Sequence, residues 1–147
     1  MMFKKKFGII LVLCFIFIGL TGCGSNGSSG KSQVYHLGDS FEYNGLKITL
    51  GKEYKPDVWP SGQQILVPIT IENISGETKE LGINFTGFGP DGSEIGMVNG
   101  GLSDSDSGTK LKSGGKLEDN IDFVAEKSGE YTIEIDDSKI SIVIVVS

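Results

Sequence analysis

Apolar residues recur at every second position through much of the chain after residue 40. Residues 65–71 carry Ile or Val at each odd position, and residues 46–50 and 131–135 follow the same period. A period of two is that of a β-strand with one buried face, and no window carries the 3.6-residue stripe of an amphipathic helix. The 22 glycines among 147 residues also suit a turn-rich β protein. The sequence therefore predicts an all-β chain.

Turn signals divide the apolar runs into short strands. Asn44-Gly45, Pro90-Asp91-Gly92 and Ser128-Gly129 are typical of tight turns. The predicted strands lie near residues 41–43, 46–50, 65–71, 81–85, 117–123, 131–135 and 140–146. Without helices, seven or eight such strands can bury their apolar faces only against each other, as two packed sheets do. We therefore expect an immunoglobulin-like antiparallel β-sandwich.

Three features do not fit a simple alternating strand. Pro68 has no backbone N–H, so we expect a sheet edge or a bulge there. Residues 143–146 are apolar on both faces, so the outer face of the last strand is expected to meet a loop, a neighbouring sheet edge or a partner. Asp119 lies in phase with Leu117 and Ile121, and is expected either to end the buried register or to form a bulge.

The N-terminal segment has the pattern of a secretory signal. Lysines occupy positions 4, 5 and 6, and residues 7–20 follow without a charged or polar side chain. A membrane-crossing helix needs about 20 apolar residues, whereas a run of 14 after a basic start is typical of a signal peptide that is cut off. We therefore expect residues 1–22 to be removed.

The residues Leu20-Thr21-Gly22-Cys23 resemble the lipobox of bacterial lipoproteins. This resemblance implies that Cys23 receives a diacylglycerol thioether and becomes the first residue of the mature chain. The alternative is an uncleaved membrane anchor in which Cys23 is an ordinary thiol. Two or three acyl chains give a lasting anchor, whereas one binds a membrane only marginally. We expect a protein held at the extracytoplasmic face of the cell membrane by lipid at Cys23.

A short linker and one domain follow the predicted cleavage point. Residues 23–33 form the lipidated cysteine and a Gly/Ser-rich linker, of which ten residues reach about 16–19 Å, and residues 34–147 show no further break in composition. Removing lysines 4–6 changes the formal charge from −6 to −9, so an anionic leaflet would repel the domain and the lipid must hold it. The same acidity argues against a nucleic-acid partner.

Several strand and turn motifs resemble one known family. They are LGDSF at 37–41, NGLKI at 44–48, VPITIEN at 67–73, PDGSE at 90–94, and KSGGK at 112–116 leading to IDF at 121–123. Together they resemble the DUF4352-type domain of bacterial lipoproteins. The resemblance implies a telokin-like, immunoglobulin-like sandwich on the surface of a Gram-positive cell, and it brings no catalytic residues. The chain departs from the family pattern at Pro68 and in the loop of residues 99–110.

Residues suited to catalysis are sparse. His36 is the one histidine, and Cys23 is the one cysteine of the predicted mature chain, with its sulfur used by the lipid. These two residues supply neither a nucleophilic triad nor a zinc site. Residues 87–92 match GxGxxG, but the turn signal within them predicts a hairpin rather than a dinucleotide site. The carboxylates of residues 118–122 come without a cleft signature. We expect a non-catalytic protein without a cofactor.

Asp104 and Asp106 are the candidate metal ligands. Two carboxylates spaced by two residues in a polar loop can share one Ca²⁺, which accepts six to eight oxygens in flexible geometry. The glycine and the final glutamate of an EF-hand loop are missing at the required spacing, so an EF-hand is excluded. A looser calcium site and a solvated polar loop both remain open.

Val58 and Trp59 are the candidate partner-binding residues. They lie between Pro56 and Pro60, in a segment that looks too broken to form a strand. An exposed aromatic side chain on a rigid loop can anchor a protein interface, although Trp59 could instead fold back over the end of the sandwich. The favoured function is a protein-interaction or adhesion module at the cell surface, with the loop of residues 99–110 as a weaker contact. The alternative is a surface lipoprotein that binds a small ligand or Ca²⁺.

Overall fold

Strands make up all the regular structure that the computed structural model describes, which covers residues 31–59, 62–98 and 109–147. In chain order they are β1 (Gln33–His36), β2 (Ser40–Tyr43), β3 (Leu46–Leu50), β4 (Lys55–Trp59), β5 (Gly62–Asn73), β6 (Lys79–Glu80), β7 (Phe85–Phe88), β8 (Glu94–Ile95), β9 (Lys110–Leu111), β10 (Lys116–Ala125), β11 (Gly129–Ile135) and β12 (Ile140–Val146). The all-β prediction is confirmed. The described part of the chain forms twelve strands, more than the seven or eight expected. β6, β8 and β9 have two residues each, too few for an alternating pattern, and β1 and β4 lie outside the predicted segments.

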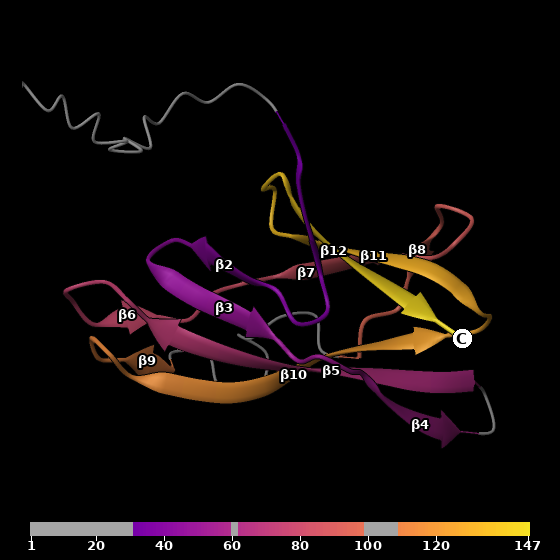
Figure 1. The fold of residues 1–147 in the computed structure, drawn as a ribbon, viewed down its shortest axis with the longest axis horizontal. Coiled ribbons are helices and arrows are strands. Elements are labelled where there is room, and N and C mark those ends of the chain that lie inside the picture. Colours follow the sequence, from indigo (N-terminus) through magenta and orange to yellow (C-terminus); the bar gives the residue numbers. More distant parts are fainter. Residues whose placement is uncertain (1–30, 60–61, 99–108) are drawn as a thin grey trace, which may run out of the picture.

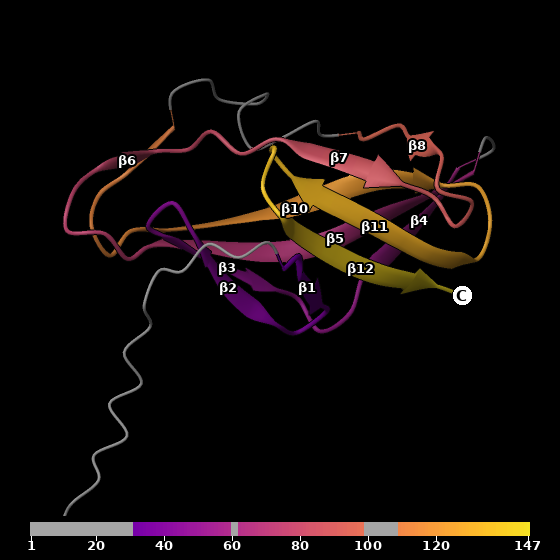
Figure 2. The same cartoon turned by 90° about the horizontal axis from the view of Figure 1, so that it is seen from above.

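Two sheets pack against each other (Figure 1). The first has the order β1-β12-β11-β7-β8, and the second has the order β10-β5-β3-β2, with β4 also paired to β5. Viewed from above, β11 and β12 cross over β5 and β10 (Figure 2). Among the described pairings β1 and β12 run parallel, whereas the other pairs of strands are antiparallel. The predicted β-sandwich is therefore confirmed.

The core lies between the two sheets and follows the alternation of the sequence. On β5 the odd positions 65–71 are almost fully buried and the even positions are half-buried. The opposite sheet contributes Ile133, Ile142 and Ile144, which are fully buried. Phe123 of β10 meets Tyr131 of β11 across the interface, with ring centroids 5.2 Å apart. Each such side chain contributes about 1.5–3 kcal/mol on burial, so this layer is the main source of stability.

The turn between β2 and β3 is the tight turn that the sequence predicts. Asn44 and Gly45 both have positive φ, at 50° and 77°. Two consecutive positive φ angles define the type I′ hairpin turn, which Asn-Gly adopts most readily. This turn fixes the pairing of Phe41 with Ile48, so both side chains are buried on one face.

Pro68 lies inside the second sheet, not at its edge. β5 pairs with β10 along ten consecutive residues without a bulge, and on its other side it pairs with β3 and then β4. β3 ends opposite Ile69 and β4 begins opposite Leu66, so Pro68 faces a gap between two strands. Its carbonyl accepts a hydrogen bond from Gly51 N–H at 2.7 Å, and its missing N–H is directed to the same side. Pro68 pairs with Asn120 of β10, so the prediction of an edge strand or a bulge is wrong, but the proline does mark a position without a partner on the side of β3 and β4.

Residues 55–59 form a strand, contrary to the expectation of a broken loop. β4 pairs antiparallel with β5 from Lys55 opposite Leu66 to Trp59 opposite Gly62. Within the described residues β4 pairs with β5 alone, and such an edge strand tolerates Pro56. Prolines at this site therefore do not exclude a strand.

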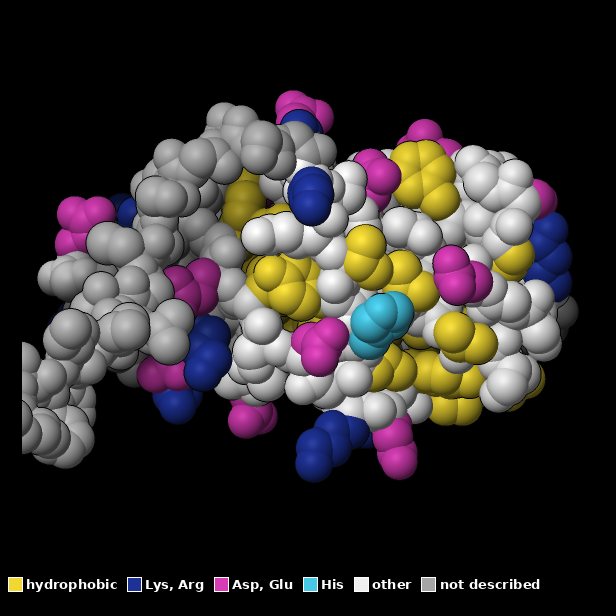
Figure 3. Space-filling model, turned by 45° about the horizontal axis from the view of Figure 1, so that its top comes forward, with side chains coloured by type: hydrophobic (Ala, Val, Ile, Leu, Met, Phe, Trp, Pro, Cys, Tyr) yellow, Lys and Arg dark blue, Asp and Glu magenta, His cyan; other side chains and the backbone are white. Residues whose placement is uncertain are grey.

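The outer face of β12 remains partly open. Val145 is 64% exposed, and Val34 of the neighbouring β1 is also exposed. Figure 3 shows apolar side chains gathered on this side of the molecule around its histidine. Neither a loop nor a sheet edge from the described residues covers Val145. Of the three expected coverings of this face, a binding partner therefore stays a prediction.

No helix in the described ranges has the length and apolar character needed to cross a membrane. Residues 1–30, which include the predicted signal peptide and Cys23, lie outside the described residues.

Candidate functional site

A groove opens on the outer face of the second sheet where β5 changes its neighbour. β3 ends at Leu50 and the chain turns away before β4 begins at Lys55. Gly51 lies against Pro68 at this point, and a Cβ on Gly51 would lie 3.1 Å from the Pro68 carbonyl oxygen. The absence of a side chain at Gly51 therefore permits the close approach that closes the end of the groove.

Polar side chains from four strands line this hollow of about 430 Å³. The register places Thr49, Thr70 and Glu118 in one row across β3, β5 and β10. The row of Lys55 and Leu66 lies on the other side, and Pro68 with its partner Asn120 lies between the two rows. The lining residues are Thr49, Leu50, Gly51, Lys55, Pro68, Ile69, Thr70, Glu118, Asp119 and Asn120. We call this the Pro68 groove.

The groove has opposite charges on its two sides. Lys55 belongs to β4, whereas Glu118 belongs to β10, with β5 between them. Asp119 stays in register opposite Ile69, so the bulge alternative is wrong. Asp119 is half-buried, and its Oδ1 accepts a hydrogen bond from Asn120 N–H at 2.8 Å. Because its partner Ile69 faces the core, the carboxylate of Asp119 lies on the inner face of the sheet, and Glu118 supplies the carboxylate on the outer face.

Asp122 lies next to the groove and is largely withdrawn from water. It is opposite Leu66 in the row of Lys55, and its side chain is only 9% exposed. Burial raises the pKa of Asp122, and the negative charge of Asp119 raises it further. The acidic side of this surface therefore includes one carboxyl group that ionises less readily than the others.

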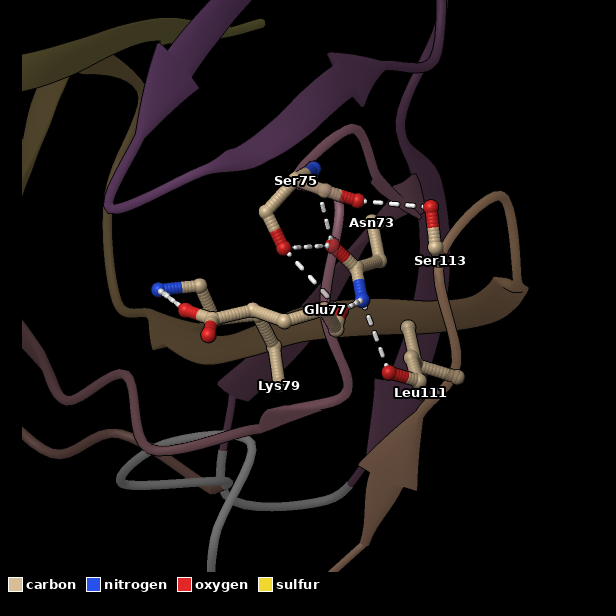
Figure 4. Close-up of polar contacts among 6 residues, drawn as sticks. All are labelled: Asn73, Ser75, Glu77, Lys79, Leu111 and Ser113. Atoms are coloured by element: carbon tan, nitrogen blue, oxygen red, sulfur yellow. Dashed lines mark hydrogen bonds and ion pairs between the residues drawn. The ribbon is translucent and has the colours of Figure 1, made fainter.

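The most buried polar side chain, Asn73, serves the fold instead of a site. Its Nδ2 donates to the carbonyls of Leu111 at 2.7 Å and Glu77 at 2.8 Å (Figure 4). Its Oδ1 accepts from the N–H and the hydroxyl of Ser75, and the Ser113 hydroxyl donates to the Ser75 carbonyl. Since these contacts tie two loops to the end of β5, we call this set of residues the Asn73 cluster.

A second polar cluster holds the same end of the sandwich. Asp136 accepts hydrogen bonds from the Tyr43 hydroxyl at 2.8 Å and from the N–H and Nδ2 of Asn84 at 2.9 Å. Partial burial acts to raise the pKa of Asp136, but the hydrogen bonds from Asn84 and Tyr43 outweigh it and keep this pKa below its usual value. Asn84 and Tyr43 are 52 and 93 residues away from Asp136 in sequence, so no local motif predicts this cluster.

The predicted partner-binding residues lie on β4. Val58 is 81% exposed, so it is available for contact. The backbone of Trp59 ends β4, while its side chain lies outside what the structure describes. Asp104 and Asp106, the predicted calcium ligands, and the predicted lipid attachment at Cys23 also lie outside the described residues.

Two further expectations concern residues within the described part. His36 is exposed on β1, and its backbone N–H donates to Asp39 at 2.8 Å. Residues 87–92 form the β7–β8 hairpin, in which Gly89 N–H donates to the Ser93 carbonyl. The hairpin prediction is confirmed, so the GxGxxG match carries no nucleotide chemistry.

The Pro68 groove was not predicted from the sequence. Its one local signal in the sequence is Pro68, a proline inside an alternating strand. The sequence alone does not show that a groove lies at this proline. The groove exists because two strands share one side of β5, and this depends on pairings between distant segments.

Comparison with known proteins supports the fold. No family model matches the chain, and no curated protein matches it. An uncharacterised β-sandwich protein from Clostridium difficile 630 is similar in structure, with a TM-score of 0.54, 10% identity, and coverage of 82% of this chain and 98% of that chain. The yjhA protein of Bacillus subtilis has a TM-score of 0.52 at 16% identity, over 77% of this chain and 99% of that chain. A conserved hypothetical protein from Bacillus anthracis has a TM-score of 0.50 at 14% identity, over 71% and 91%.

These likenesses define the class of protein as a β-sandwich and no more. At such low identity a shared fold does not carry a shared activity. The resemblance to DUF4352-type lipoprotein domains stays a prediction.

Proposed function

We propose that this chain is a lipid-anchored, non-catalytic β-sandwich of the DUF4352 type, held outside the cytoplasmic membrane, where β4 binds a protein partner. The observation that carries the proposal is the exposed position of β4 at one end of the second sheet (Figure 1). Among the described strands β4 pairs only with β5, and Val58 on it is 81% exposed.

An edge strand of this kind offers two means of recognition. Its outward backbone groups can pair with a strand of another protein, and alternate side chains can enter pockets of that protein. Val58 supplies an exposed apolar side chain for such a contact, and Trp59 follows it in the sequence. A valine with most of its surface in water gains free energy when a partner covers it.

The anchoring part of the proposal is supported by the sequence before β1. Leu20-Thr21-Gly22-Cys23 has the lipobox pattern, and the linker that follows leads directly into β1 at Gln33. A linker with a reach of about 16–19 Å would keep the sandwich near the bilayer while leaving it free to turn.

Anchoring is tested with Cys23→Ala in the full-length gene expressed in a Gram-positive host. The parent protein should fractionate with membranes and carry the mass of a diacylglycerol group on its first residue. The variant should lack that mass and remain an uncut precursor. A parent protein without acyl mass would refute the anchor.

Partner binding is tested with a photoreactive residue at position 58 in cells. We expect a discrete crosslinked protein, and this product should fall when unlabelled purified parent protein is added to the cell surface but not when Val58→Asp protein is added. The matched control places the photoreactive residue at 74, an exposed isoleucine just beyond the other end of β5. The same product from both positions, or equal competition by both proteins, would refute a role for β4.

A further inference from the structure

We propose that the Pro68 groove binds a small zwitterion, specifically a short peptide with free termini, lying across β5. Its carboxylate would face Lys55, and its ammonium group would face Glu118. The volume of about 430 Å³ is within the usual range of small-ligand sites and holds two or three residues. Lys55 is the first residue of β4, but Val58, the contact of the proposed function, lies three residues further along the strand and points to the opposite face of the sheet.

The spacing of the charged groups is the first argument. Lys55 is opposite Leu66 and Glu118 is opposite Thr70, so their positions are separated by four residues along β5 and by two strand spacings across it. With about 3.3 Å per residue and about 4.8 Å per strand, their Cα atoms lie about 16 Å apart. Both side chains line the groove. They leave room for a ligand whose opposite charges are separated by several ångströms.

The middle of the groove matches the backbone of a peptide. Thr70 and Asn120 line it and offer a hydroxyl and an amide, which can both donate and accept hydrogen bonds. Between them Pro68 presents a ring and no N–H, so the floor has an apolar patch below the polar walls. A sugar could use the hydroxyl and the amide, but it would leave the opposed charges of Lys55 and Glu118 unmatched.

Opposite charges on the two sides of the groove give it a direction. Lys55 presents an ammonium group and Glu118 presents a carboxylate, and both belong to the outward-facing rows of the sheet. The ligand is therefore expected to bind in one orientation.

The probe is the tripeptide Ala-Ala-Ala with free termini, compared with its N-acetylated form and its C-amidated form. Binding is followed by amide chemical shifts of the ¹⁵N-labelled full chain in detergent. We expect saturable shifts at Thr70 and Asn120 at millimolar peptide, and an affinity about threefold weaker when either terminus is capped, because exposed ion pairs are worth about 0.2–1 kcal/mol. No saturable shift, or equal affinity for the three peptides, would overturn the proposal.

Charge exchange tests the orientation. Lys55→Glu and Glu118→Lys should each weaken binding of the free tripeptide, and the double variant should restore it with the peptide reversed. Lys47→Glu is the matched control, because Lys47 is exposed on the same sheet outside the groove. Thermal melting establishes that each variant is folded before titration.

Three results would contradict this arrangement: unchanged affinity in both single variants, a double variant no better than either, or a loss in Lys47→Glu equal to that in Lys55→Glu. Val58→Asp should bind the tripeptide as the parent does. The groove and the proposed β4 interface therefore succeed or fail separately.

Discussion

The two ends of β5 differ in how their side chains are used. At its C-terminal end Asn73 is fully buried, and its side chain holds two loops through four hydrogen bonds. The neighbouring turn is held by Asp136 through Tyr43 and Asn84. At the other end β4 is an edge strand, and Val58 is exposed to water. We call the end at Asn73, where polar side chains are buried and hydrogen-bonded, the closed end. We call the end at β4, where side chains lie at the surface, the open end.

This difference separates residues that stabilise the fold from residues that can bind. A buried polar group that loses its hydrogen-bond partners destabilises the folded state, so the Asn73 cluster stabilises the fold and is not available for binding. The Pro68 groove has polar side chains that face water. It lies at the gap between the end of β3 and the start of β4, which one continuous strand would fill. The comparison therefore predicts large stability losses at the closed end and small ones at the open end.

The largest expected effect comes from Asn73→Ala. Truncation removes the acceptor for Ser75 and the donor for the carbonyls of Leu111 and Glu77, inside a site without exposed surface. We expect a loss of about 3 kcal/mol in the free energy of unfolding and a fall of more than about 10 °C in Tm. Urea denaturation of the parent and the variant measures this loss.

The matched control is Asn120→Ala in the Pro68 groove. Asn120 is also an asparagine on a strand of the second sheet, but it is half-buried and opposite the gap at Pro68. We expect a loss below about 1 kcal/mol. If the two asparagines cost the same, the distinction between a closed and an open end is wrong.

Gly51→Ala should have the next largest effect. The new Cβ would lie 3.1 Å from the Pro68 carbonyl oxygen and 3.2 Å from carbons of its ring, and the carbonyl also accepts the Gly51 N–H. Either the hydrogen bond or the end of β3 must shift, so we expect a loss of about 1–2 kcal/mol by urea denaturation. Gly76→Ala is the control, because nothing lies within 4 Å of its added Cβ. Equal losses would show that Gly51 is not tightly packed.

Much of the fold follows from the sequence because its causes are local. The alternation in residues 65–71 predicts the buried face of β5, and Asn44-Gly45 predicts the hairpin between β2 and β3. Each of these depends on neighbours a few residues away. Such patterns suffice for the fold class and for the main strands.

The candidate site depends on pairings that no local pattern contains. Pro56 argues against a strand at 55–59, yet β4 forms because β5 extends past β3 and offers it an edge to pair with. The groove at Pro68 then arises from the distance between the end of β3 and the start of β4. The exposure of Val58 could be suspected from the sequence, but the neighbouring groove could not.

The smallest expected effect is a difference in pH dependence between Asp136 and Asp122, one carboxyl group at each end. The folded pKa of Asp136 is lowered by its hydrogen bonds, so its stabilisation is present above the unfolded value near 3.8 and is lost as the pH falls through the folded pKa. The folded pKa of Asp122 is raised by burial, so its contribution is greatest below that unfolded value and is lost as the pH rises through the folded pKa.

Asp136→Asn and Asp122→Asn should therefore change the pH profile in opposite directions. The destabilisation caused by Asp136→Asn should be largest at neutral pH and shrink below about pH 4. The free energy of unfolding of Asp122→Asn, relative to that of the parent, should be most favourable at neutral pH and least favourable in acid. Urea denaturation from pH 3 to pH 7 measures both differences, and Asn suits position 136 because it tolerates the positive φ of 45° there. Profiles that move in the same direction would show that burial, and not hydrogen bonding, governs both carboxyl groups.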